Sequence, residues 1–155
     1  MSDKPAATLT WRKGDYEIST DPARVDLAAV HAFLTTDAYW SKGVALAVVR
    51  RAIEGSIVFG LYRGGHEQAG FTRVVSDRAT FAWICDVFVL DAHRGHGLGK
   101  WLMECVMAHP DLAGLRRWML ATRDAHGLYR QYGFTDLRDA ASYMERWDPE
   151  IYRRG

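Results

Sequence analysis

Three glycines, Gly95, Gly97 and Gly99, alternate with other residues directly after an apolar segment and directly before a helix-like one. At a strand-to-helix junction, alternating glycines let the backbone approach an anion closely, because they carry no side chain. The N–H groups of such a turn and of the first helical turn then offer hydrogen-bond donors and partial positive charge. The turn therefore predicts a phosphate-binding loop, with a tight turn that holds no ligand as the alternative.

The common nucleotide fingerprints do not fit this turn. A Walker A loop needs a glycine at the position of Arg94 and a serine or threonine at that of Trp101. A dinucleotide-binding G-x-G-x-x-G motif needs a further glycine at Lys100 or at Leu102. Neither nucleotide fingerprint is therefore present, and glycines alone do not identify the ligand of this turn.

Asp86 is a lone carboxylate within the otherwise apolar segment WICDVFVL. A charge in such a strand is costly unless it has a partner or a task. Asp86 is therefore either a chemically active group or a structural carboxylate that binds backbone groups or an arginine such as Arg73.

Composition narrows the class of protein. The 155 residues are 48% hydrophobic and 25% charged, with a formal net charge of +1, which is typical of an ordinary globular domain. No clustered basic excess is present, so we expect no nucleic-acid partner. The six histidines show no paired metal-ligand spacing, so we expect no metal site.

The cysteines and the apolar segments indicate the compartment. Cys85 and Cys105 each lie among apolar residues. We therefore expect both to be small buried hydrophobic side chains rather than partners in a disulfide. The first residues contain no signal-peptide-like stretch, and no segment approaches the roughly 20 apolar residues of a membrane span. We expect a cytoplasmic protein with no membrane partner.

Apolar periodicity and turn residues predict the elements that position these groups. Strands are predicted at 16–20, 56–64, 67–77, 79–90, 115–122, 134–137 and 142–147, and helices at 22–34, 44–54, 97–108 and 125–132. The strand–helix–strand run over 79–122 makes its two strands parallel. The expected fold is of the α/β (α+β) class: a mixed, mostly antiparallel, twisted sheet of about six or seven strands with helices on both faces. We expect a single domain over residues 1–155.

Two motifs resemble those of the GNAT superfamily of acetyl-coenzyme A dependent N-acetyltransferases. The spacing Arg94-x-x-Gly97-x-Gly99 is similar to the pyrophosphate-binding loop of that family, and AHGLYRQYGF (125–134) is similar to its late helix. The order of elements also matches over about 16–147, nearly the whole chain. The resemblance is specific for the fold and the cofactor, not for the acceptor.

The resemblance implies that the turn holds the pyrophosphate of coenzyme A and that a neighbouring strand carries its pantetheine arm through backbone groups. Thr122 stands where many members of the family have asparagine, so its contact with the cofactor is an open point. The implied cofactor-binding residues are Val87, Phe88, Val89, Arg94, Gly95, His96, Gly97, Leu98, Gly99, Lys100, Thr122 and Tyr129.

The resemblance also assigns chemical roles. Tyr129 matches the phenol that protonates the departing thiolate, with Tyr132 as the rival, since a phenol with a pKa of about 10 is protonated at neutral pH. Asp86, beside the expected thioester, is the candidate that takes the proton of the amine, directly or through water, or binds its cation. An acceptor pocket lined by aromatic side chains is predicted, although each of them could instead belong to the core: Phe33, Tyr39, Trp40 and Trp83.

The predicted function is transfer of an acetyl group from acetyl-coenzyme A to a primary amine by direct attack in a ternary complex. The acceptor remains open among small polyamine-like or amino-sugar amines, an amino acid, and a protein N-terminus or lysine. The alternative is a coenzyme A-binding sensor or interaction module that kept the fold and lost catalysis. A homodimer is a further hypothesis.

Overall fold

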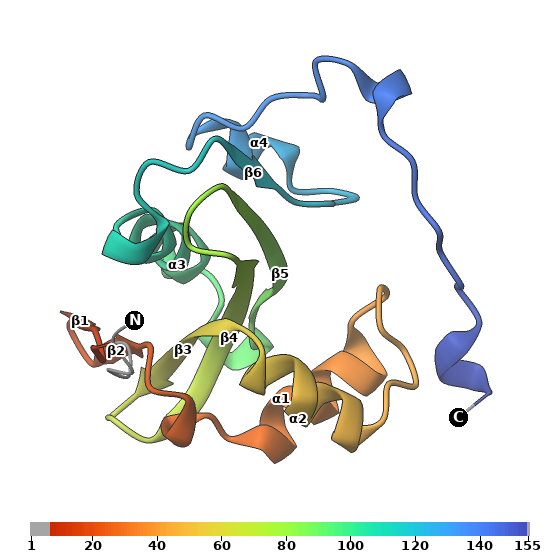
Figure 1. The fold of residues 1–155 in the computed structure, drawn as a ribbon. Helices are drawn as coiled ribbons and strands as arrows, with labels where there is room; N and C mark the ends of the chain where they lie inside the picture. The colour runs from red at the N-terminus through yellow and green to blue at the C-terminus, as the bar shows by residue number, and fades with distance from the viewer. Residues whose placement is uncertain (1–6, 155) are drawn as a thin grey trace.

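The computed structural model describes residues 7–154 and contains one open sheet with helices on both faces (Figure 1). Six strands lie side by side in chain order, and only the last pair, β5 and β6, is parallel. The strands are β1 (Thr10–Lys13), β2 (Tyr16–Ser19), β3 (Ile57–Arg63), β4 (Glu67–Ser76), β5 (Phe81–Val89) and β6 (Arg117–Met119). The predicted fold class and the parallel pair are confirmed.

Four α-helices and several short turns complete the described chain. The α-helices are α1 (Leu27–Ala32), α2 (Leu46–Glu54), α3 (Leu98–Met107) and α4 (His126–Arg130). The short turns are η1 (Pro22–Arg24), η2 (Phe33–Asp37, a π-helical turn), η3 (Asp91–His93), η4 (Pro110–Leu112), η5 (Ala140–Ser142) and η6 (Ile151–Arg153).

Each face of the sheet has its own core. Helices α1 and α2 cover one face, where Val49 and Ile53 of α2 pack with Phe71 and Phe88 of the sheet. Helices α3 and α4 belong to the core on the other face. In α3, Leu98, Leu102 and Val106 recur every fourth residue and are buried, which is the apolar stripe of an amphipathic helix. This packing fixes the start of α3, and hence the glycine turn, against the sheet.

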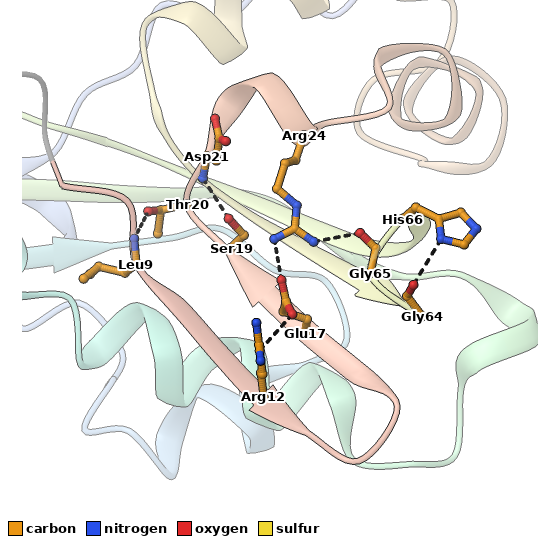
Figure 2. Close-up of polar contacts among 10 residues, drawn as sticks. All are labelled: Leu9, Arg12, Glu17, Ser19, Thr20, Asp21, Arg24, Gly64, Gly65 and His66. Atoms are coloured by element: carbon orange, nitrogen blue, oxygen red, sulfur yellow. Dashed lines mark hydrogen bonds and ion pairs between the residues drawn. The ribbon is translucent and has the colours of Figure 1, made fainter.

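Strand β1 is not among the strands predicted from the sequence. It forms a hairpin with β2 around Gly14 and Asp15, and Gly14 takes a positive φ of 58°, a conformation that glycine adopts at little cost. Figure 2 shows how β2 is tied to its surroundings: Arg24 donates to Glu17 and, at 2.9 Å, to the carbonyl oxygen of Gly65. The signal for this hairpin was the glycine between two short alternating segments.

The helix predicted over 22–34 is broken in two. Asp21 caps the single turn η1, and Asp26 caps α1 with its own carboxylate. The backbone N–H of Asp26 donates to the Gln68 side chain on β4 at 2.9 Å. A cap residue has extended rather than helical dihedral angles, so the second cap prevents one continuous helix.

The strands predicted at 134–137 and 142–147 are wrong: neither segment forms a strand in the described chain. After α4 the chain lies across a groove from β6 and passes through η5, and it forms no sheet pairing with β6. Strand-forming residues alone do not make a strand when the ladder partner is missing.

Candidate active site

The strand β5 carries one extra residue at Asp86. Strand β4 pairs Phe71 with Phe88 and Arg73 with Cys85, so the β5 segment between these pairs is one residue longer. Asp86 takes a positive φ of 58°, a conformation that few residues other than glycine adopt. This β-bulge twists β5 locally, and Asp86 lines a cavity beside the strand.

That cavity opens because β5 and β6 separate. Their parallel pairing joins Phe81, Ala82 and Trp83 only to the three residues of β6, so the second half of β5 has an unpaired edge on this side. A cavity of about 580 Å³ lies between this part of β5 and the chain that follows β6. Residues 84–87 line it on one side and residues 120–125 on the other.

Aromatic side chains form the outer wall of the cavity. Tyr39 and Trp40, from the loop after η2, line it together with Trp83 of β5. The Arg123 guanidinium lies 3.5 Å from the centre of the Tyr39 ring, and the Arg123 backbone N–H donates to the Tyr39 hydroxyl at 3.1 Å. Phe33, the fourth aromatic residue predicted for the acceptor pocket, is buried in the core, where it packs among apolar side chains.

The carboxylate of Asp86 has two side-chain donors. One oxygen accepts from Trp40 Nε1 at 2.8 Å and the other accepts from Arg73 Nε at 2.6 Å. Burial is the largest single influence on Arg73 and lowers its pKa, but the attraction and hydrogen bond of Asp86 together with weaker contributions from Cys85 and Tyr152 outweigh burial and raise the pKa of Arg73 above its ordinary value. The arginine partner foreseen for Asp86 is therefore present, and the pair still faces the cavity.

The structure separates the two candidate phenols. Tyr129 of α4 is buried and lines the cavity, and this burial raises the pKa of its phenol. Tyr132 instead donates to the carbonyl oxygen of Lys100 on α3 at 3.0 Å and does not line the cavity. Thr122 also lines the cavity, and its hydroxyl accepts from the Ala125 N–H at 3.0 Å, just before α4. Of the two candidate phenols, Tyr129 is the one that lines the cavity.

The glycine turn lies at the carboxyl end of β5. Gly95 and Gly97 have positive φ angles of 87° and 71°, and a Cβ placed on either would meet nothing within 4 Å. The backbone of the turn therefore borders open space. The first hydrogen bond of α3 runs from Trp101 N–H to the Gly97 carbonyl, so the amides of residues 98–100 precede it and have no partner within the helix.

The charged groups of the turn are partly engaged. Arg94 donates through Nε to the Val89 carbonyl at 3.0 Å and pairs through its guanidinium with Asp91 at 2.6 Å. Both Lys100 and His96 are exposed, and the Leu98 side chain is buried in the core. Within this turn, the backbone is therefore more accessible to a ligand than any one side chain.

A buried histidine that was not among the predicted site residues anchors the turn. His93 Nδ1 forms a hydrogen bond of 2.9 Å with the Tyr16 hydroxyl on β2, and its Nε2 lies 3.7 Å from a carboxylate oxygen of Glu67 on β4. The sequence signal was only the position of His93 directly before Arg94. The contacts hold the entry of the turn against two strands.

Within residues 7–154, no group of three or more histidine, cysteine, aspartate or glutamate side chains could hold a metal ion. In the same residues, no helix has the length and apolarity needed to cross a bilayer. Both cysteines are free thiols: burial raises the pKa of Cys85 to about 11 and that of Cys105 to about 12. Cys105 is buried, as the sequence indicates, and Cys85 is half-buried.

Comparison with known proteins decides the family. The sequence model of the family described as "Acetyltransferase (GNAT) domain" matches residues 54–136. A Gibberella zeae protein that carries the provisional name of an acetyltransferase is 34% identical over an alignment 151 residues long, and the match covers 83% of this chain and 84% of that protein. The chain belongs to the GNAT acetyltransferase family. The resemblance based on the glycine turn and the late helix is confirmed.

Solved structures agree with this GNAT assignment. A Xanthomonas campestris protein described as belonging to the GNAT family is 52% identical, with a TM-score of 0.86 over 88% of this chain and 96% of that chain. Glucosamine-6-phosphate N-acetyltransferase from Arabidopsis thaliana has a TM-score of 0.60 at 16% identity over 85% of this chain and 97% of that chain. The second comparison shows the common fold alone.

The matched GNAT region does not contain the whole cavity. It includes the bulge at Asp86, the glycine turn and Tyr129, all within residues 54–136. Tyr39 and Trp40, which form part of the outer wall, precede it.

Proposed function

We propose that this GNAT protein is an N-acetyltransferase that moves an acetyl group from acetyl-coenzyme A to a primary amine by direct attack, with both substrates bound. The observation that carries the proposal is the unpaired edge of β5. It borders a cavity that holds Tyr129 and Asp86, and it ends at the glycine turn. An extended ligand arm that ends in a pyrophosphate matches an open strand edge followed by an anion-binding turn.

The glycine turn fits a pyrophosphate. Because a Cβ on Gly95 or Gly97 would project into open space, the two glycines leave the backbone accessible to a bulky anion. The amides of residues 98–100 and the positive end of the α3 dipole supply donors and charge. Lys100 adds a cation at the surface. When bound, acetyl-coenzyme A supplies the thioester whose carbonyl carbon the amine attacks.

We assign the role of proton donor to Tyr129. An ordinary phenol has a pKa of about 10, and burial raises the pKa of Tyr129 further, so its hydroxyl carries the proton at neutral pH. Tyr129 Oη then donates to the sulfur as negative charge develops there. A positioned general acid of this kind contributes about 10²- to 10⁴-fold to the rate.

We assign the acceptor end of the cavity to Asp86 and the aromatic wall. Each Asp86 oxygen accepts one side-chain donor and keeps a further lone pair, with which it can hold an ammonium or amine. An alkylamine with a pKa of about 10 costs roughly 4 kcal/mol to deprotonate at pH 7. The apolar rings of Trp40 and Trp83 remove water from the nitrogen, which favours its neutral form.

The test is amine-dependent release of thiol from acetyl-coenzyme A. Small polyamines, amino sugars, amino acids and lysine-containing peptides should each be offered, with a tertiary amine of similar size as the control. The proposal predicts thiol release with at least one primary amine and none with the tertiary amine. Coenzyme A binding without release for every primary amine would favour the alternative, a sensor or interaction module.

A further inference from the structure

One arginine of the cavity lies flat on an aromatic ring. The central carbon of the Arg123 guanidinium is 3.5 Å from the centre of the Tyr39 ring, which is the separation of two stacked planes in van der Waals contact. The Tyr39 hydroxyl also accepts from the Arg123 backbone N–H at 3.1 Å, across 84 positions of sequence. These two contacts hold Arg123 against the wall of the cavity that Tyr39 forms.

The stacked guanidinium keeps its hydrogen-bonding edge free. The N–H groups of a guanidinium lie in its plane, so a ring against its face leaves them directed outward. Among residues 7–154, no carboxylate pairs with Arg123. A planar fork of donors in a fixed orientation is the geometry that recognises a carboxylate through two parallel hydrogen bonds.

The second arginine of the cavity is already paired. Arg73 donates through Nε to Asp86 at 2.6 Å and through Nη1 to Ser56 Oγ at 3.3 Å. The positive charge of Arg73 is therefore offset within the wall itself. Of the two arginines that line the cavity, Arg123 is the one that offers its charge to a ligand.

Asp86 and Arg123 lie at the two ends of one row of aromatic contacts. Asp86 accepts from Trp40 Nε1 at 2.8 Å, and the Trp40 and Tyr39 rings meet edge to face with their centres 5.1 Å apart. Tyr39 then carries the Arg123 guanidinium. Both rings are partly exposed. A ligand that lies along this row meets a carboxylate at one end, a guanidinium at the other and apolar surface between them.

We propose that the acceptor is an amino acid, with its ammonium at Asp86 and its carboxylate paired with the Arg123 fork. This inference rests on the proposed function and narrows its acceptor from any primary amine to a zwitterion. The ammonium gives one proton to solvent by way of Asp86. The neutral nitrogen then forms the amide C–N bond as the C–S bond breaks, and its second proton balances the one that Tyr129 gives to the thiolate. The carboxylate takes part in no bond change and positions the amine.

A carboxylate fits the charges of the cavity better than a phosphate does. The charged side chains that line it are two arginines and two aspartates: Arg73, Arg123, Asp86 and Asp124. Because these charges balance, the cavity has no cationic excess with which to hold a dianion. The single charge of a carboxylate needs only the one guanidinium fork.

The first experiment measures kcat/KM by thiol release for a set of amino acids, each compared with its own primary amide. The amide keeps the skeleton and the amine but removes the negative charge. For the best amino acid, kcat/KM should exceed that of its amide at least about tenfold, about 1.4 kcal/mol. Equal values for acid and amide, or a preference for aminoethyl phosphate, a polyamine or a lysine peptide, would overturn the proposal and leave acetyl transfer to amines in place.

Arg123→Gln and Arg130→Gln form a matched pair of variants. Arg130 is exposed on α4, pairs with Asp136 at 2.8 Å and does not line the cavity. Arg123→Gln should abolish the preference for the acid, mainly by raising KM for the amino acid, and should keep the activity with the amide and the affinity for coenzyme A. Arg123→Lys keeps the charge without the planar fork, so it should restore only part of the preference. Arg130→Gln should keep all of it.

Two results with these variants would reject the subsite. Equal losses for acid and amide in Arg123→Gln would show that Arg123 acts through the fold. Weaker binding of coenzyme A in the same variant would assign Arg123 to the cofactor instead of the acceptor.

A binding measurement separates this subsite from the proposed function. The complex with coenzyme A is titrated calorimetrically with the same amino acids and amides, which requires no transfer. An amino acid that binds more tightly than its amide, and loses that advantage in Arg123→Gln, supports the subsite even if no thiol is released, and acetyl transfer is then the claim that fails. Amides that bind as tightly as their acids throughout the set would reject the subsite.

Discussion

Replacing Gly97 by alanine tests the assignment of the glycine turn against an internal control. Gly97 has a φ of 71°, and an added Cβ would meet nothing within 4 Å. The cost to the fold is therefore backbone strain alone, about 1–2 kcal/mol for a left-handed residue other than glycine. In a chain of this size that corresponds to a melting temperature lower by about 2–8 °C.

Gly114 provides the matched control. It has a φ of 73°, and its Cβ would also meet nothing within 4 Å, but it lies in the loop before β6, outside the cavity. Gly114→Ala should lose the same stability and bind coenzyme A like the wild type. In Gly97→Ala the new methyl group occupies the open space assigned to the pyrophosphate, so affinity should fall at least about tenfold, about 1.4 kcal/mol.

Thermal unfolding measures the loss of stability, and calorimetric titration with coenzyme A measures the loss of affinity. Unchanged affinity in a folded Gly97→Ala variant would refute the assignment of the turn. An equal loss of affinity in both variants would show that general strain, rather than contact with the ligand, determines the result.

Further predictions concern the two phenols, the ion pair and pH. Tyr129→Phe should keep coenzyme A affinity and lower kcat by about 10²-fold, the scale of a lost general acid, while Tyr132→Phe should leave kcat nearly unchanged; the reverse pattern in a thiol-release assay would mean that the wrong phenol was assigned. Asp86→Asn leaves the largely buried guanidinium of Arg73 without its charged partner, so the free energy of unfolding should fall by about 1–3 kcal/mol and KM for the amine should rise. Adding Arg73→Met should restore stability but not KM, and recovery of both would show that Asp86 acts only through the fold. Burial lowers the pKa of His109, so the unfolded chain binds more protons and the stabilisation, present above about pH 6.5, is lost as pH falls below it. His109→Asn should weaken this dependence in thermal unfolding, and an unchanged dependence would contradict the assignment to His109.

The cofactor side of the site could be predicted because its signals are local. Alternating glycines after an apolar strand predict a turn independently of the rest of the chain. Gly97 takes the left-handed conformation that such a turn needs. The apolar stripe of α3 was visible as a four-residue repeat. The fold class followed from the order of these elements.

The remaining features depend on contacts between distant segments. Phe33 and Trp40 are close in sequence, yet one packs in the core and the other donates to Asp86. No periodicity separates them, because the π-helical turn η2 changes the direction of the chain between them. The bulge at Asp86 arises from the register between β4 and β5, which a single strand does not encode.

The predicted C-terminal strands failed for a related reason. Residues 142–147 include strand-forming residues such as Tyr143 and Trp147, but in the described chain the sheet ends at β6 and this segment does not pair with it. A prediction from sequence describes the tendency of a segment and not the presence of its partner.

The central claim, direct transfer to an amine, is tested most directly by following the acetyl group itself. Acetyl-coenzyme A labelled in its acetyl carbonyl is incubated with the protein and a primary amine that supports thiol release, and mass spectrometry locates the label. Since burial raises the pKa of Cys85, the cysteine that lines the cavity, to about 11, its thiol stays protonated and is a poor nucleophile. The account predicts the label in an amide on the amine and none on the protein. A labelled Cys85, or coenzyme A binding with no labelled amide, would contradict it.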